Sequence, residues 1–204
     1  MRDRQREETR RRLYLAALDV FRRDGVQGCR IDDIAQKAEV SRAAFYFHFP
    51  TKEHVLLDFL AESEVPTAKV ITDLPATTSL EQLLNATVES MASVWQKEAA
   101  LLVDAMTVSI RHTAVLDDRE AGGPVRHLMA QRFKELAARG ELSSILAPDM
   151  LSDLFLSEMF VGLMVWGHAP HTPLETMLKA TLQLFLQGAK PTAKAPAPAV
   201  VAKK

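Results

Sequence analysis

The segment SRAAFYFHFPTK, residues 41–52, carries the side chains whose types and spacing point most directly to chemistry. Arg42 has a guanidinium fork that fits a guanine edge or a phosphate. Tyr46 offers a hydroxyl and Lys52 an ammonium, and both groups donate to phosphate oxygens. Ala43 is short enough to let a helix approach a DNA groove closely. This combination favours binding to nucleic acid over catalysis.

Two other clusters of polar residues could serve a metal site or catalysis. His168 and His171 lie three residues apart, but neither an HExxH nor a CxxC pattern accompanies them. The acidic run at residues 117–120 is typical of a loop that faces solvent. No nucleophile stands beside a base in a recognisable order. We therefore expect no metal site, no cofactor and no enzymatic activity.

Residues 31–49 predict two short helices that would position the donors. Ile34 and Ala35 fall on the inner face of the first helix, and a bend of about three residues follows. Phe45 and Phe49 lie four apart on one face of the second helix, from which they would point back into the core. The opposite face then carries small, cationic and aromatic side chains. This pattern is typical of a helix-turn-helix, although an ordinary helical hairpin can resemble it.

Charge is distributed unevenly along the 204 residues, whose formal net charge is −1. Residues 1–50 hold 11 Lys and Arg against 8 Asp and Glu, whereas residues 51–189 hold 10 against 18. Residues 190–204 add 4 lysines and no acid. A basic N-terminal part on an acidic body indicates that the N-terminal part meets a polyanion.

The composition, 48% hydrophobic and 25% charged, is ordinary for a globular chain. The single cysteine, Cys29, excludes an internal disulfide and fits a reducing cytoplasm. The charged N-terminus lacks the apolar region of a signal peptide, and no run of 18 apolar residues predicts a membrane span. We therefore expect a cytoplasmic protein without a membrane partner.

Hydrophobic spacing is helical almost throughout, and no window shows the sustained alternation of a strand. We expect an all-α fold of about nine helices, with an N-terminal helix-turn-helix head and a larger helical body. The expected helices cover residues 8–23, 31–38, 41–50, a segment from 51 onward, 80–98, 101–111, 125–139, 148–166 and 174–187. The tail from residue 190 is too poor in large apolar side chains to pack.

Residues 25–57 resemble the tetracycline-repressor (TetR) family of bacterial transcription regulators. The resemblance rests on Gly25, Asp33, Ile34, Ala35, Ala38, Val40, Ser41, Phe45, Tyr46, His48, Phe49, Lys52 and Leu56. It covers residues 8–60, and beyond them only the all-α character and the length agree. It implies a head that binds DNA and a body that binds a small molecule and forms a homodimer.

The resemblance divides the chain into three expected parts. Residues 1–55 would form the TetR-type helix-turn-helix domain, and residues 56–189 the ligand-binding and dimerisation domain. Residues 190–204 would form a disordered basic tail that adds nonspecific affinity for DNA.

Three positions depart from the family pattern. Glu39 stands where the family usually has glycine in the bend, and at positive φ a glutamate costs about 1 kcal/mol relative to glycine. Arg30 replaces a threonine that often caps the first helix of the motif, so it offers a phosphate contact but no cap. Ala44 replaces a common threonine or glycine, which removes one hydroxyl contact.

The residues expected to contact double-stranded DNA lie on or beside the second helix of the motif. They are Arg30, Ser41, Arg42, Ala43, Ala44, Tyr46, Phe47, His48 and Lys52. Ser41 is also expected to cap that helix. One short helix reads few bases, so two copies about 34–36 Å apart would read both halves of a palindromic operator.

The last two helices are too apolar for one small domain to cover. Pairing with their symmetry mates would form a four-helix bundle, whereas a buried hairpin within one chain is the alternative. The expected dimer interface consists of Leu151, Phe155, Met159, Leu163, Trp166, Leu174, Met177, Leu178, Leu182 and Phe185.

The expected effector pocket lies among the middle helices, where methionine and aromatic side chains could make an adaptable cavity. Its candidate lining residues are Met91, Trp95, Met106, Ile110, Phe133 and Phe160. Plain core packing is the alternative for each of them. Few charges fall on the inner faces of these helices, which favours a lipophilic or weakly polar effector.

These expectations combine into a ligand-responsive DNA-binding regulator, most simply a repressor that leaves its operator when a small molecule binds. The resemblance implies that the effector shifts the fourth helix, which carries Lys52 at one end. The sequence fits an activator equally well. The alternative from another class is an all-α small-molecule-binding protein or enzyme with a vestigial helix-turn-helix, against which the intact basic head argues.

Overall fold

The computed structural model describes residues 2–112, 123–143, 145–168 and 171–189. Within these ranges the regular elements are all α-helices, which confirms the expected fold class. They are α1 (Arg2–Gly28), α2 (Ile31–Lys37), α3 (Arg42–His48), α4 (Lys52–Asp73), α5 (Leu80–His112), α6 (Pro124–Ala138), α7 (Pro148–His168) and α8 (Leu174–Ala189). The expected tail at 190–204 and most of the expected loop at 117–124 lie outside the described residues.

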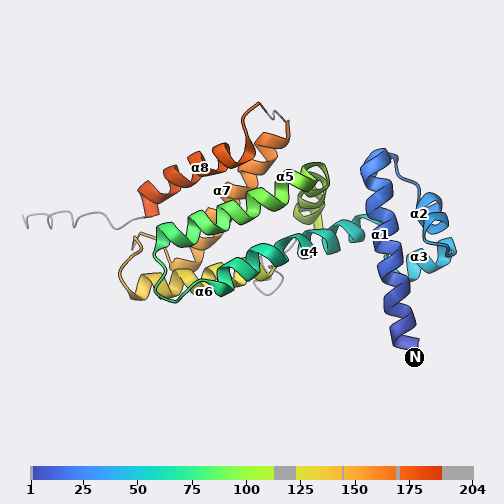
Figure 1. Cartoon of the computed structure of the whole chain (residues 1–204), viewed down its shortest axis with the longest axis horizontal. Helices are drawn as coiled ribbons and strands as arrows, with labels where there is room; N and C mark the ends of the chain where they lie inside the picture. The colour runs from blue at the N-terminus through green and yellow to red at the C-terminus, as the bar shows by residue number, and fades with distance from the viewer. Residues whose placement is uncertain (1, 113–122, 144, 169–170, 190–204) are drawn as a thin grey trace, which may run out of the picture.

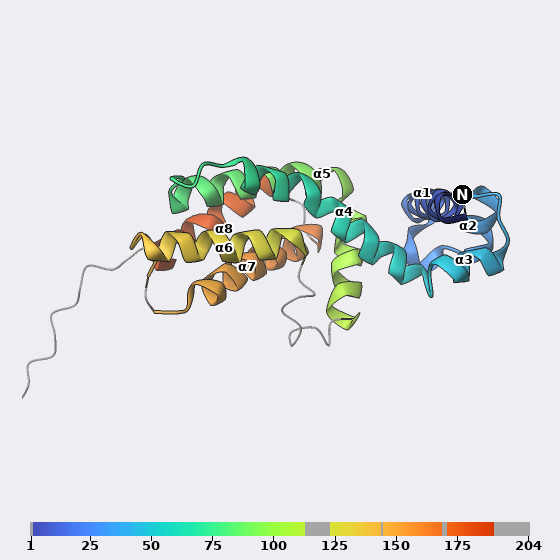
Figure 2. The same cartoon turned by 90° about the horizontal axis from the view of Figure 1, so that it is seen from below.

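The helix count over the described ranges is eight, because two expected helices are one. The predicted helices at 80–98 and 101–111 join in α5, which bends at Glu98 (φ −131°, ψ 28°). Figure 2 shows the two parts of α5 running in different directions. The bend explains why the hydrophobic pattern looked interrupted at this point.

The molecule is elongated, with α1–α3 at one end and α5–α8 at the other (Figure 1). Helix α4 runs from the first group, which we call the head, to the second, which we call the body. In the body α4 packs against α5 and α6, while α7 packs against α6 and α8. One continuous helix therefore connects the candidate reading elements with the interior of the body.

The core of the head forms where α1, α2 and α3 cross. Phe45 and Phe49 are fully buried, with ring centroids 5.8 Å apart, as their spacing of four predicted. Ile34 from α2 and Phe21 from α1 are buried in the same core cluster. Because the inner face of α3 packs into this core, its other side chains lie at the surface.

The first helix begins earlier than expected, at Arg2, but is interrupted where the sequence predicted. Gly25 adopts φ 72° and ψ 159°, which is not helical, and one further turn follows. In that turn the amide of Cys29 donates to the carbonyl oxygen of Gly25 at 3.1 Å. Carbonyl groups of this turn accept hydrogen bonds from Lys52, the first residue of α4.

The bend between α2 and α3 is a Schellman motif with glutamate at its left-handed position. Glu39 has φ 55°, the single positive φ among non-glycine residues of the described ranges. Its amide donates to the carbonyl of Gln36 at 3.1 Å, and the amide of Val40 donates to that of Ala35 at 3.0 Å. Glu39 therefore has the positive φ at which glutamate costs about 1 kcal/mol relative to glycine.

The end of α6 shows the same motif with glycine in place of glutamate. Gly140 has φ 74°, and its amide donates to the carbonyl of Ala137 at 3.0 Å. The amide of Glu141 donates to the carbonyl of Leu136, also at 3.0 Å. The same chain thus has one Schellman motif with glycine at the left-handed position and one with glutamate there.

Aromatic rings fill the centre of the body. Phe133 from α6, Phe155 from α7 and Phe185 from α8 are buried, with ring centroids 5.4–6.5 Å apart. Such rings stabilise a core by large buried areas and by tilted contacts. This cluster fixes α6, α7 and α8 against one another.

Helix α4 contains a proline, Pro66, between its head end and its body end. Proline has no amide hydrogen, so one hydrogen bond of the helix is absent at this turn. On the head side α4 is tied to α1, because Tyr14 donates its hydroxyl to Glu62 at 2.9 Å and Arg11 pairs with the same carboxylate at 2.6 Å.

Candidate nucleic-acid interface and internal pocket

The start of α3 is fixed by a side-chain cap. Ser41 occupies the N-cap position in an extended conformation, and its Oγ accepts a hydrogen bond from the amide of Ala44 at 3.1 Å. Arg30 occupies the corresponding position of α2 and makes no side-chain cap there, as the departure from the family pattern implied. Arg30, Ser41 and Ala43 are exposed.

Arg42 and Tyr46 form an exposed pair on the outer face of α3. Arg42 Nη1 lies 3.2 Å from both carboxylate oxygens of Asp32, and its Nη2 donates to the Tyr46 hydroxyl at 3.4 Å. The guanidinium also lies 5.7 Å from the centroid of the tyrosine ring. The surface position of Arg42 makes the bond to Asp32 easy to exchange for another acceptor.

The end of α3 carries an exposed aromatic ring under an arginine. Phe47 is 67% exposed, and the guanidinium of Arg6 lies 5.1 Å from its centroid. His48 packs edge-on against Phe47. Burial, together with the positive charges of Arg6 and Arg10, lowers the pKa of His48. The positive charge at this end therefore comes from α1 and not from the histidine.

Lys52 has a position that sequence reasoning did not anticipate. Its Nζ donates to three backbone carbonyls at the end of α1, those of Val26 at 2.6 Å, Gln27 at 3.4 Å and Cys29 at 3.3 Å. A lysine has three donors, so all of them are used here. Lys52 thus fastens the start of α4 to the last turn of α1, and a phosphate contact would require it to leave these carbonyls.

A cavity of about 210 Å³ lies between α4, α5, α6 and α7. Its lining residues are Leu60, Ser63, Glu64, Thr67, Met91, Trp95, Met106, Ser109, Val125, Arg126, Leu156 and Phe160. Four of the six expected residues are among them. Phe133 is instead part of the aromatic cluster of the core, and the side chain of Ile110 lies outside the described residues.

The cavity contains charged groups that the sequence reading did not place there. The carboxylate of Glu64 accepts a hydrogen bond from the amide of Val125 at 3.3 Å, and burial raises the pKa of this carboxyl. Arg126 donates from Nε and Nη2 to the two oxygens of Asp153 at 2.8 and 2.9 Å. Continuing the inward spacing of Leu56 and Leu60 by four residues would have pointed to Glu64.

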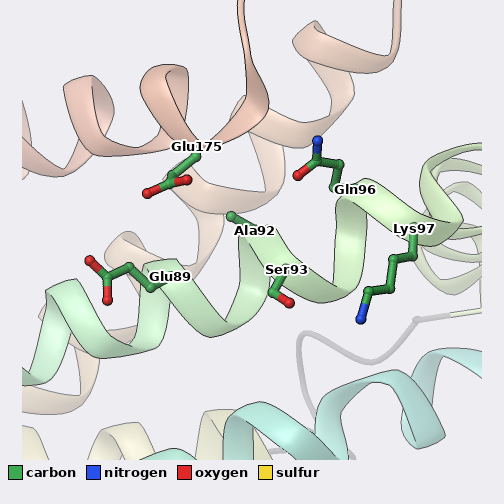
Figure 3. Close-up of a pocket in the computed structure, with 6 residues that line it drawn as sticks. All are labelled: Glu89, Ala92, Ser93, Gln96, Lys97 and Glu175. Carbon is green, nitrogen blue, oxygen red and sulfur yellow. The ribbon is translucent and has the colours of Figure 1, made fainter.

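A larger hollow of about 600 Å³ lies on the outside of the body. Figure 3 shows its side chains, with Glu89, Ser93, Gln96 and Lys97 on α5 and Glu175 on α8. Lys179 bridges the carboxylates of Glu89 and Glu175 at 3.2 and 2.7 Å. The hollow is therefore a polar surface with its own ion pairs.

No group of three or more His, Cys, Asp or Glu side chains that could hold a metal ion occurs within the described ranges. The side chain of His168, one of the two histidines considered above, is outside those ranges.

Residues 13–59 match the family described as bacterial regulatory proteins, tetR family. The chain is 40% identical over 93 residues to the HTH-type transcriptional regulator SrpR of Pseudomonas putida, a match that spans 45% of this chain and 44% of SrpR. It is 39% identical over 93 residues to TtgW of Pseudomonas putida, an uncharacterised HTH-type regulator of which the match spans 69%. The chain belongs to the TetR family.

The whole TetR fold is also matched by a solved structure. Thermus thermophilus FadR, a TetR-family transcriptional repressor in complex with lauroyl-CoA, superposes with a TM-score of 0.75 at 27% identity. The superposition covers 93% of this chain and 98% of that one. The likeness therefore extends through the body, beyond the segment on which the sequence resemblance rested.

The residues expected to form a dimer interface on α7 and α8 lie largely inside the single chain. The structure buries most of the expected residues inside the single chain, namely Leu151, Phe155, Met159, Leu163, Leu174, Leu178, Leu182 and Phe185. Trp166 and Met177 are partly buried against the same core. Residues that fill the core of one subunit are not free to contact another, so this assignment is corrected.

The opposite faces of these TetR helices expose apolar side chains instead. On α7 they are Met150, Leu154, Val161 and Val165, and Leu184 on α8 is 71% exposed. This outer stripe explains why Pro148–Gly167 has the length and mean hydropathy (1.4) of a membrane span although 33% of it is buried. The apolar character of α7 thus comes from two apolar sides, of which the chain itself covers one and leaves the other exposed.

Proposed function

We propose that this chain is a ligand-responsive transcriptional repressor. It binds a palindromic DNA operator as a homodimer and leaves the operator when a small molecule occupies the cavity of the body. The observation that carries the proposal is the division of α3, whose Phe45 and Phe49 are buried while Arg42 and Tyr46 lie at the surface. That division supports a reading helix rather than a packing helix.

Several features of the head support contact with double-stranded DNA. Ala43 and Ala44 place small side chains in the first turn of α3, so that its backbone can approach the major groove. Arg42 is the candidate for a guanine edge, and Tyr46 and Ser41 are candidates for phosphate contacts. The exposed ring of Phe47 suits the methyl group of a thymine.

The exposed apolar stripe on α7 and α8 supports a homodimer. A second copy that presents the same stripe would cover Leu154, Val161, Val165 and Leu184 in a four-helix arrangement. Pairing also places two copies of α3 on one particle, which recognition of a palindrome requires. Residues 1–55 would then bind DNA, whereas residues 56–189 would form the dimer and bind the ligand.

The position of the cavity supports the regulatory step. Four of its lining residues, Leu60, Ser63, Glu64 and Thr67, belong to α4, whose other end carries the head. A molecule that fills the cavity therefore contacts the helix that orients α3, and the related FadR was solved with lauroyl-CoA bound. Binding to one arrangement of α4 in preference to another lowers operator affinity by that difference.

A DNA titration tests the proposal. The duplex is the intergenic DNA upstream of the protein's own gene, and binding is followed by fluorescence anisotropy at several salt concentrations. We expect a dissociation constant that rises with salt with a logarithmic slope of several, because phosphate contacts release counterions. A flat salt response would instead favour the alternative, a small-molecule-binding protein or enzyme with a vestigial helix-turn-helix.

The sign of regulation needs a separate measurement. A reporter fused to the same intergenic DNA should be silenced by the protein if it is a repressor. Expression that rises with the protein would identify an activator and leave the DNA-binding part of the proposal intact.

A further inference from the structure

Glu64 is a carboxylate placed in an otherwise mainly apolar cavity. The surrounding walls include Met91, Trp95, Met106 and Phe160, and the carboxylate lies at the side formed by α4 and α6. Glu64 is half-buried there, and a carboxylate partly shielded from water is stabilised by a hydrogen-bond donor. The structure supplies one hydrogen bond, from the amide of Val125 at 3.3 Å, which leaves acceptor capacity on a group with two oxygens.

Room for this carboxylate is provided by a glycine. A Cβ atom at Gly123 would collide with the carboxylate of Glu64, so that a larger residue there would displace it. Gly123 has φ −59°, which any residue can adopt. The missing side chain of Gly123 therefore leaves the space that the end of Glu64 occupies, and backbone conformation does not call for the glycine.

Among the residues that the structure describes, Arg126 is the other charged residue lining the cavity, and it does not neutralise Glu64. Arg126 lines the cavity, but its Nε and Nη2 both donate to Asp153, with which they form a two-pronged ion pair. That pair is balanced in charge, so an anion would have to compete with Asp153 for the arginine. Within the described part of the lining, the carboxylate of Glu64 is thus the negative group that no cation pairs with.

We propose that Glu64 is the polar recognition group of the effector pocket and that the effector is a compact lipophilic molecule bearing a protonated amine. The inference rests on the proposed function, since it names the class of molecule to which that regulator responds. An ammonium would donate a charge-assisted hydrogen bond to Glu64, while the ring or chain of the molecule contacts the apolar walls.

The same residue links recognition to regulation. Glu64 belongs to α4 and its hydrogen-bond donor Val125 belongs to α6, so their bond fastens the two helices together beside the cavity. An ammonium that engages Glu64 competes with the weaker neutral donor of Val125. Binding then loosens α4 from α6 at the point where α4 leaves the body for the head.

Three probes that share one apolar group test the recognition step. They are 2-cyclohexylethylamine, which is a cation at neutral pH, 2-cyclohexylethanol, which is neutral, and 3-cyclohexylpropanoate, which is an anion. Binding is followed by the fluorescence of Trp95 in the full-length Trp166→Phe protein, in which Trp95 is the remaining tryptophan. We expect the amine to bind about tenfold more tightly than the alcohol, and the anion to bind most weakly.

Two variants assign the preference to Glu64. In Glu64→Gln the amide oxygen can still accept from Val125, but the charge is lost, so the amine and the alcohol should bind within about twofold of each other. Asp73→Asn removes a carboxylate from the same helix outside the cavity, where it pairs with Lys69 at 2.6 Å. This control should keep the tenfold preference of the parent protein.

A third variant changes the position of the carboxylate without removing it. Gly123→Ala should displace the end of Glu64, which is a flexible side chain, and reduce the preference for the amine while the fold persists by circular dichroism. An unchanged preference in both Glu64→Gln and Gly123→Ala would overturn the inference.

The outcomes separate this inference from the proposed function. If the three probes bind equally well, or the anion binds best, Glu64 is not the recognition group, whereas operator binding and its release by a probe remain as proposed. If no probe changes Trp95 fluorescence, the cavity is not an effector pocket and the inference falls with it. DNA titrations of the same protein without any probe test the operator side independently.

Discussion

Arg22 Nη2 lies 2.8 Å from Glu98 Oε1, and Arg22 Nε lies 3.2 Å from Glu98 Oε2. This two-pronged ion pair joins α1 of the head to the residue at which α5 bends in the body. Both side chains are partly exposed, so their contribution to stability is small, about 0–1 kcal/mol. The ion pair matters for its place in the fold, because it connects the head to the body directly, without passing through α4.

Loss of this ion pair should weaken communication between the cavity and the DNA-binding surface. We expect Arg22→Gln to reduce the ratio of operator affinities measured without and with an effector, while the thermal midpoint changes little. Arg23→Gln is the matched control, since Arg23 pairs with its neighbour Asp24 on the same helix and loses the same charge. Equal ratios for the two variants would show that the pair carries no coupling.

Replacing Glu39 by glycine should stabilise the head. The glutamate has φ 55°, and glycine adopts this conformation freely, so Glu39→Gly should raise the free energy of unfolding by about 1 kcal/mol. Chemical denaturation measures the difference. Glu39→Gln removes the charge and keeps the strain, so it should give no such gain, and Gly140→Ala at the equivalent position of α6 should lose a similar amount.

The contacts of Lys52 predict a stability effect rather than a phosphate effect. Lys52→Met removes the donor for three carbonyls and should lower the free energy of unfolding by about 1–2 kcal/mol. The salt slope of DNA binding should stay the same. Lys37→Met is the control, because Lys37 is an exposed lysine of α2 that pairs with Asp19. A slope lowered by about 1 at unchanged stability would instead assign Lys52 to a phosphate.

A carboxylate on the outer face of α7 should separate the subunits. Val161 lies among the exposed apolar side chains and one turn from Glu158, whose Oε2 is buried and has no hydrogen-bond partner within the described chain. We expect Val161→Glu to raise the dimer dissociation constant by about 100-fold or more, since two carboxylates would be buried together. Analytical ultracentrifugation measures this, and Ile145→Glu, at an exposed residue before α7, should leave the dimer intact.

Loss of the positive charge of Arg42 on α3 should weaken operator binding. Arg42→Ala should weaken operator binding by about 1–3 kcal/mol and relax the preference at one base pair, if its guanidinium reads a base. Asp32→Asn frees the same guanidinium from its present partner and should strengthen binding to all duplexes. Competition with a set of single-base operator variants distinguishes the two effects, and an Arg42→Ala loss that is equal for every variant would make Arg42 a phosphate ligand.

Local signals predicted the head well. The spacing of Phe45 and Phe49 placed the inner face of α3, and the serine before that helix predicted its cap. The positive φ of Glu39 followed from comparison with the usual family residue. The extension of α1 to Arg2 was missed because its first turns are charged on every side and carry no hydrophobic period.

The body was harder to predict because α7 is apolar on two opposite faces. Periodicity shows that such a helix has two apolar faces, but it does not show which face meets the same chain. The residues with the largest side chains, such as Phe155 and Met159, were assigned to the partner and in fact fill the core. Glu64 was missed for a related reason, since a charged residue in a helix usually faces solvent and its burial depends on where α6 begins.

The proline of α4 has a mechanical consequence. Pro66 follows Glu64 by two residues, so the missing hydrogen bond falls between the part of α4 that holds the head and the part that packs in the body. A helix that lacks a hydrogen bond at one turn bends most easily at that turn. We therefore expect α4 to bend near Pro66, so that a small change of its direction beside the cavity moves its first residues, and the head attached to them, over a larger distance.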